Sequence, residues 1–151
     1  DKFYSPECVG FGPKMQVLKT AHFNTQNQSI IGFAEPEKFY LTGSPIVDLW
    51  MSSFEVAFQV MALKGIMIGK GLCIPLSLDS VQISRVPRGR IRFQVELHEV
   101  HKENDMFPMR GTIRAYDEEN RLCFKMNNVM MSKIRHFDTI PFDSIAKDIE
   151  I

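Results

Sequence analysis

The sequence lacks several features that point to particular classes of protein. It has only three cysteines, Cys8, Cys73 and Cys123, an odd number without the spacing of a zinc site. A reduced, cytoplasmic setting without a bound metal is therefore expected. There is no signal peptide, and no apolar run looks long enough to cross a bilayer, so no membrane span is expected.

Excess charge of either sign is also absent. Eighteen basic residues balance eighteen acidic ones, so no overall field attracts nucleic acid, and nucleic acid is not an expected partner. The 151 residues are enough for one domain with a real hydrophobic core. The chain begins with Asp1 instead of methionine, which is typical of a piece of a longer protein.

What is present is a change of hydrophobic period along the chain. Residues 15–23 and 29–34 are predicted strands, and a helix is predicted over about residues 49–66, with Asp48 as its N-cap. Alternation with a period of two then predicts four more strands. These strands lie at residues 81–84, 91–98, 109–116 and 121–133, with a hairpin turn at residues 117–120.

This order of elements predicts an α+β architecture, with a single helix and an antiparallel sheet. One helix does not cover both faces of a sheet, but it fits the concave face of a strongly curved one. We therefore expect the hotdog fold, a curved antiparallel sheet wrapped around one long central helix, over residues 1–135. Residues 136–151 are expected to form a C-terminal tail or linker. Hotdogs usually pair, so a second hotdog domain or a homodimer is an expected partner.

The predicted helix carries one acid on an otherwise apolar stretch. Glu55 and Gln59 are four residues apart and share a helix face with Met51. A carboxylate among Met51, Phe54 and Phe58 is costly to bury without a partner. Either Glu55 looks into solvent from the rim of the helix, or it lies in a ligand pocket and acts as an acid or base.

Four stretches of the chain, in order, resemble motifs of one enzyme family. They are residues 10–16 (GFGPKMQ), 55–59 (EVAFQ), 74–81 (IPLSLDSV) and 116–121 (YDEENR). They are similar to Tyr-Gly-Pro-x-Phe-Gln, Asp-x-x-x-Gln, Leu-Pro-Phe-Ser-Trp-Glu-Gly-Val and Tyr-Asp-Glu-Asp-Gly-Arg. These are motifs of the dehydratase domains of polyketide synthases, which hold two hotdogs in one polypeptide. The chain resembles the second, C-terminal hotdog over about residues 3–134.

The resemblance implies a function in polyketide or fatty-acid-like biosynthesis. The implied substrate is a 3-hydroxyacyl thioester carried on the phosphopantetheine of an acyl carrier protein, with no further cofactor. Glu55 matches the catalytic acid of the family, and Gln59 matches the glutamine that helps to hold that acid or the leaving water. The residues expected to bind substrate come from the opening motif and the helix: Phe11, Gly12, Pro13, Met51, Phe54 and Phe58.

The chain departs from the family pattern in its helix motif and in the absence of the catalytic histidine motif. Trp50 and Met51 stand where the family's helix motif has His-Pro, and Glu55 replaces an aspartate. The family's catalytic histidine belongs to a His-x-x-x-Gly-x-x-x-x-Pro motif in the first hotdog. None of the four histidines here, His22, His98, His101 and His136, is followed by that glycine and proline. Dehydration needs a base as well as an acid, so the base would have to come from a preceding hotdog or a partner chain.

Three functions therefore remain open from the sequence. The chain is the C-terminal half of a dehydratase, a noncatalytic hotdog that binds an acyl chain or organises a synthase, or a hotdog thioesterase that uses the helix glutamate. The basic stretch at residues 85–92 (RVPRGRIR) could bind the phosphate of a phosphopantetheine arm. A hairpin turn at residues 87–90 with solvated arginines is the favoured interpretation of that stretch.

Overall fold

The computed structural model describes residues 16–24, 29–69, 71–100, 108–138 and 148–150. A short 3₁₀ turn, η2 (Pro36–Lys38), precedes the single long helix α1 (Pro45–Gly69). The strands, in chain order, are β1 (Leu18–Asn24), β2 (Ser29–Ala34), β3 (Gly71–Ser77), β4 (Ser80–Ile83), β5 (Ile91–Val100), β6 (Pro108–Tyr116), β7 (Leu122–His136) and β8 (Asp148–Glu150).

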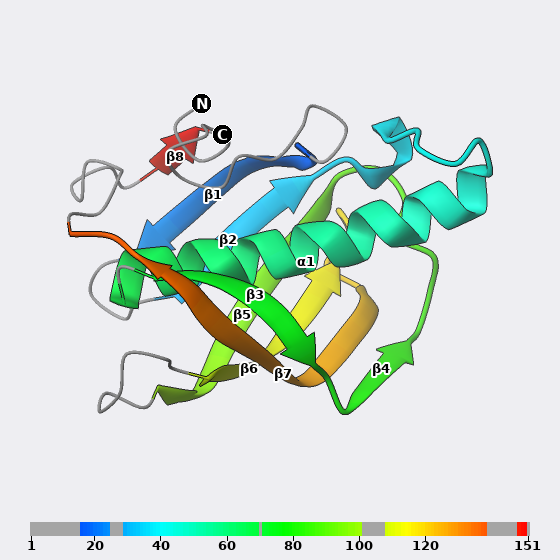
Figure 1. Ribbon diagram of the computed structural model, residues 1–151. Helices are drawn as coiled ribbons and strands as arrows, with labels where there is room; N and C mark the ends of the chain where they lie inside the picture. The colour runs from blue at the N-terminus through cyan, green and yellow to red at the C-terminus, as the bar shows by residue number, and fades with distance from the viewer. Residues whose placement is uncertain (1–15, 25–28, 70, 101–107, 139–147, 151) are drawn as a thin grey trace.

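All the strands belong to one antiparallel sheet that curves around the helix (Figure 1). The strand order is β3-β7-β6-β5-β2-β1-β8, and β4 also pairs with β7, beyond the end of β3. The predicted architecture, a curved antiparallel sheet around one long central helix, is confirmed. The hairpin predicted at residues 117–120 is present between β6 and β7, and Asn120 adopts the left-handed backbone conformation that this turn requires.

The core lies between the concave face of the sheet and one side of α1. Because side chains alternate along a strand, every second residue of β5 and β6 points at the helix. In β7 the buried positions change from Phe124 and Met126 to Val129 and Met131, across the register shift in its pairing with β6. At Gly32 on β2 the backbone approaches the helix closely, since a Cβ there would lie only 2.2 Å from Cγ2 of Val60. The buried side chains that meet in this core include Val56, Val60, Leu63, Ile66, Phe93, Ile113, Phe124 and Met126.

The helix begins one turn earlier than the sequence predicts. It starts at Pro45, so Asp48 lies inside the first turn, and the prediction that Asp48 is the N-cap is wrong. The Asp48 carboxylate accepts hydrogen bonds from the Thr42 hydroxyl and the Thr42 amide, both at 2.7 Å, and from the Gly43 amide at 3.3 Å. These bonds hold the pKa of Asp48 below its usual range, and the bond from the Thr42 hydroxyl has the largest effect. Asp48 thus fastens the preceding loop to the helix.

Three other segments differ from the sequence prediction. The strand β3, which the alternation did not predict, contains Pro75, and its pairing with β7 shifts register between Pro75 and Ser77. Since proline does not donate a hydrogen bond to a β-ladder, it is tolerated at an edge or a bulge.

The interpretation of residues 87–90 as a hairpin turn is wrong, because the strands on either side of it do not pair with each other: β4 pairs with β7, whereas β5 pairs with β2 and β6. In the predicted tail, β8 pairs with β1; the domain boundary itself stays a prediction.

By length and composition alone, residues 45–68 would be long and apolar enough to cross a membrane, although the sequence pattern suggested no such run. In the structure most of this segment is buried against the sheet. It is the core helix of the domain.

Candidate functional site

The candidate acid lies where α1 passes from exposed to buried. Met51, Glu55 and Gln59 form one stripe along the helix. Met51 is 43% exposed, Glu55 is half-buried and Gln59 is 1% exposed. Glu55 therefore lies at the border between the exposed and the buried part of this stripe.

Hydrogen bonds fix the Gln59 side chain and, through it, Glu55. The Leu18 amide of β1 donates to Oε1 of Gln59 at 3.3 Å, and Nε2 of Gln59 donates to Oε1 of Glu55 at 3.0 Å. A backbone N–H only donates, so the Gln59 atom that faces Leu18 has to be the oxygen. The Glu55 carboxyl is therefore held by a glutamine, as the resemblance to the dehydratase motif implies.

An aromatic cluster lies beside this pair. The Trp50 ring lies 5.6 Å from that of Phe54 and 6.1 Å from that of Phe124, and Phe54 meets Phe124 edge-on at 5.3 Å. Phe93 continues the cluster into the core at 6.2 Å from Phe124. Trp50, which replaces the family's histidine in this motif, thus serves packing. Phe54 and Phe58 are both half-buried against the core; their role in substrate binding stays a prediction.

The remaining predicted residues do not complete the site. Phe11, Gly12 and Pro13 lie outside the described residues. His22 is exposed on β1 and meets Phe33 edge-on, and Nε2 of His98 lies 2.6 Å from Oγ1 of Thr112. By the alternation along their strands, both histidines project from the outer face of the sheet, opposite α1. His101 and the side chain of His136 are not described, so within the described part of the chain no histidine lies beside Glu55.

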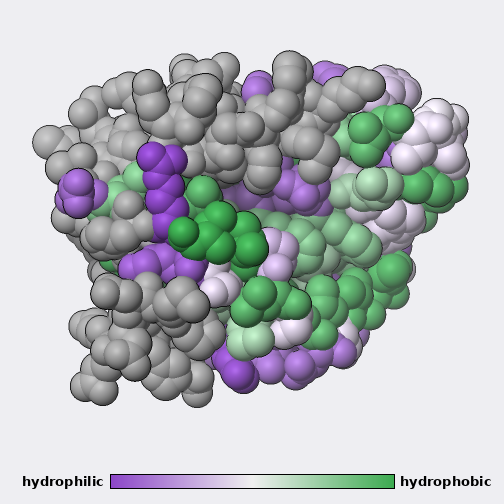
Figure 2. All heavy atoms as spheres, viewed as in Figure 1, coloured by the Kyte–Doolittle hydropathy of each residue, from purple (hydrophilic) through white to green (hydrophobic). Residues whose placement is uncertain are grey.

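Exposed apolar side chains gather in two places. The helix patch consists of Tyr40, Leu41, Ile46, Val47 and Met51, at the start of α1 and in the loop before it. The edge patch consists of Ile74, Leu76, Ile83 and Val86, along β3 and β4 at one end of the sheet. Figure 2 shows hydrophobic surface over the exposed part of the helix and below it, on the side of these strands. Surfaces of this kind mark interaction sites.

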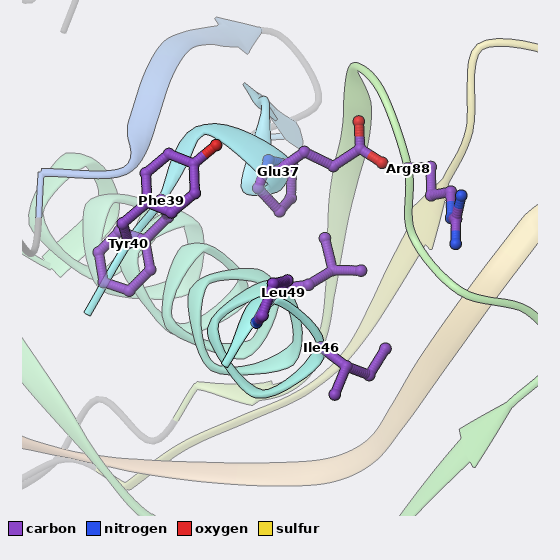
Figure 3. Close-up of a pocket in the computed structure, with 8 residues that line it drawn as sticks. Glu37, Phe39, Tyr40, Ile46, Leu49 and Arg88 are labelled. Atoms are coloured by element: carbon purple, nitrogen blue, oxygen red, sulfur yellow. The ribbon is translucent and has the colours of Figure 1, made fainter. Parts of the chain in front are cut away.

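A cleft of about 380 Å³ opens beside the first two turns of α1 (Figure 3). Its walls are mainly apolar, from Phe39, Ile46 and Leu49, and Glu37 and Arg88 stand at its rim. The Glu37 carboxylate accepts a hydrogen bond from the Gly89 amide at 3.2 Å. Neither Glu55 nor Gln59 lines this cleft or the three others that stand out among the described residues. The ligand pocket considered for Glu55 from the sequence is not one of these four clefts and stays a prediction.

Other reactive groups are placed for structure. Among the described residues, no group of three or more His, Cys, Asp or Glu side chains is arranged to hold a metal ion. Cys73 and Cys123 are buried free thiols. Burial raises the pKa of Cys73 to about 11 and also raises the pKa of Cys123, so neither is a ready nucleophile at neutral pH.

Comparison with known proteins identifies the fold. No protein-family model matches the sequence, and no curated protein matches it either. Among solved structures, the chain is similar to a bifunctional dehydratase-cyclase domain of ambruticin biosynthesis, with a TM-score of 0.55 and 15% identity over 88% of this chain and 46% of that one. It is also similar to a trans-acyltransferase polyketide synthase enoyl-isomerase, with a TM-score of 0.56 and 14% identity over 80% of this chain and 46% of that one. The chain thus spans about half the length of these two relatives.

A second group of similar structures consists of thioesterases. One, from Haemophilus influenzae, matches with a TM-score of 0.53 and 14% identity over 71% of this chain and 72% of that one. These identities are low, so what the two groups share with this chain is its fold. The similarity in fold to polyketide synthase dehydratase domains, expected from the sequence motifs, is confirmed: this chain is a hotdog-fold domain of the type found in those domains and in thioesterases.

Proposed function

We propose that this chain is the acid-bearing half of a paired hotdog dehydratase that acts on 3-hydroxyacyl thioesters. The observation that carries the proposal is the Glu55–Gln59 pair, bonded at 3.0 Å on the central helix at the border of the helix patch. The polyketide synthase relatives, of which this chain spans about half, support a second hotdog as the other half. The acyl carrier protein that would present the thioester belongs to the same proposal.

In the proposed reaction Glu55 protonates the leaving hydroxyl group. A base on the second hotdog removes the proton next to the thioester carbonyl, and the electron pair of that C–H bond becomes the new C=C bond. The C–O bond to the 3-hydroxyl breaks as Glu55 gives its proton to that oxygen, so water leaves and the Glu55 carboxylate remains. Gln59 keeps the carboxyl aimed at the leaving oxygen.

The second hotdog is proposed to cover both apolar patches. The described part of β3 pairs only with β7, so its other side is available to another strand. A domain joined along that edge would reach the helix patch and enclose Glu55 in a shared cavity. A second copy of the chain has the same fold and is the homodimeric alternative to a separate histidine-bearing hotdog.

A thioesterase is the second candidate, favoured by the similar thioesterase structures. A noncatalytic hotdog that binds an acyl chain or organises a synthase is the third, favoured by Trp50, whose ring packs where the family's helix motif has a histidine. The three candidates differ in product: an enoyl thioester, a free acid or neither.

The test is to incubate a 3-hydroxyacyl pantetheine thioester with the chain alone and with the chain joined to a histidine-bearing hotdog. We expect enoyl product only from the joined form. Glu55→Gln in the joined form should lower kcat by at least about a hundredfold, because an amide does not supply the proton that the leaving hydroxyl needs. Turnover by the chain alone would mean that it contains its own base. Free acid would favour the thioesterase, and no product from the joined form would favour the noncatalytic hotdog.

A further inference from the structure

The N-terminal strand contributes a backbone group to the site around Glu55. The pairing of β1 with β2 shifts register between Leu18 and Thr20, which places an irregularity in the strand directly after Leu18. In a regular ladder, backbone N–H groups lie in the plane of the sheet and point at the neighbouring strand. Here the Leu18 N–H donates to the side chain of Gln59 on the helix. Bulges often re-aim groups in this way beside active sites.

The buried position makes this contact consequential. Leu18 and Gln59 are each 1% exposed, so the orientation of the Gln59 carboxamide is set by protein groups rather than by bulk water. With its oxygen turned to Leu18, the carboxamide can present only N–H groups to Glu55. Oε1 of Glu55 is thereby committed as an acceptor. No described residue bonds Oε2 of Glu55, so this second oxygen is the one available to a substrate.

We infer that the irregularity of β1 directly after Leu18 is a positioning element, which orients Glu55 through Gln59 so that Oε2 carries the proton delivered to the leaving hydroxyl. Leu18 and Gln59 are positioning residues, and Glu55 is the catalytic residue. The chemical role rests on the proposed function. The relay from the Leu18 amide through Gln59 to Glu55 is a property of the folded chain and can be tested without turnover.

The first experiment measures amide hydrogen exchange in β1 by NMR on the intact protein. Gln59→Met keeps the length of the side chain and removes the hydrogen bonds to Leu18 and Glu55, whereas Gln59→Glu keeps an oxygen for Leu18. Gln59→Met should speed exchange of the Leu18 amide about fivefold relative to that of Ala21, and Gln59→Glu should leave that ratio unchanged. As the control for general loosening of the core, Val60→Ala should speed both amides alike. An equal change at Leu18 and Ala21 in Gln59→Met would overturn the inference.

The second experiment measures kinetics in the joined, histidine-bearing form. Gln59→Met should lower kcat at least tenfold with KM nearly unchanged, because misplacing Glu55 affects the transition state more than ground-state binding. A rise in KM with unchanged kcat would assign Gln59 to substrate binding and contradict the positioning role. If even the unmodified joined form makes no enoyl product, the dehydratase proposal fails, and the exchange ratio at Leu18 still decides whether the relay exists.

Discussion

The two halves of α1 have similar composition but different surroundings. In the second half, residues 56–67, nearly every side chain is buried. In the first half, Ile46, Val47 and Met51 are exposed and form the helix patch with the loop before them. Glu55 stands at the boundary. The contrast indicates that the second half belongs to the core of this domain, whereas the first half keeps an apolar surface that the described part of the chain leaves exposed.

The largest effect expected from this contrast concerns stability. Leu63→Ala, in the buried half, should lower the free energy of unfolding by about 2–5 kcal/mol because it leaves a cavity. Ile46 lies in the first half and is 52% exposed, so Ile46→Ala should lower the free energy of unfolding of the unpaired chain by less than about 1 kcal/mol. Urea unfolding, followed by the fluorescence of the single tryptophan, Trp50, compares the two. Similar costs at both positions would mean that the halves do not differ as described.

A second stability test concerns the close approach of the sheet to the buried half. A Cβ at Gly32 would meet Val60 and Leu18, so Gly32→Ala should destabilise the fold by about 1–3 kcal/mol through overpacking. Val60→Ala in the same chain should recover part of that loss. At Gly43 nothing lies within 4 Å of the position that a Cβ would take, so Gly43→Ala would be opposed only by the positive backbone φ of 81°. A Gly32→Ala chain as stable as the unmodified one would contradict the packing.

The exposed half should matter for association instead. Met51→Lys places a charge in the helix patch and should weaken pairing with a second hotdog about tenfold to a hundredfold, with little change in the stability of the unpaired chain. Sedimentation measures the pairing. Lys38→Met, a surface change outside both patches, is a control that should leave pairing unchanged. Equal affinity for Met51→Lys would place the partner on another face.

The smallest expected effect is the pH dependence of the loop that leads into the exposed half. Hydrogen bonds from Thr42 and Gly43 lower the pKa of Asp48 in the folded chain, so in the acid range the unfolded chain binds more protons. The stabilisation by Asp48 is therefore present above about pH 4 and lost as the pH falls through the folded pKa. Urea midpoints between about pH 2 and pH 5 should fall more steeply in the unmodified chain than in Asp48→Asn. Parallel curves would mean that Asp48 does not fasten this loop.

Much of the fold could be predicted because each signal was local. The alternation in β5, β6 and β7 and the long apolar helix are properties of consecutive residues, and together they indicated the curved sheet. The strand β3 was missed because its sequence, GLCIPLS, contains Pro75 and does not alternate clearly. Its place in the sheet comes from pairing with β7, a contact between distant segments. The start of α1 was missed by one turn because the acidic side chain of Asp48 caps a loop instead of the helix end.

The site was predictable only in part, for the same reason. The spacing of Glu55 and Gln59 predicted that they share a face, and their hydrogen bond follows from it. The Leu18 amide has no signal in the sequence, because the register shift that aims it depends on how β1 meets β2. The exposed helix patch also has no local signal, since an apolar helix reads the same whether a sheet or a partner covers it.

The most direct test of the central claim, that a partner hotdog covers the first half of α1, is oxidation footprinting of two methionines on this helix. Met51 is exposed and Met61 is fully buried, so in the unpaired chain hydroxyl radicals should oxidise Met51 much faster than Met61. In the assembly with a histidine-bearing hotdog, Met51 should become protected at least fivefold, while Met61 stays protected throughout. Met51 oxidised equally fast with and without the partner would contradict the claim.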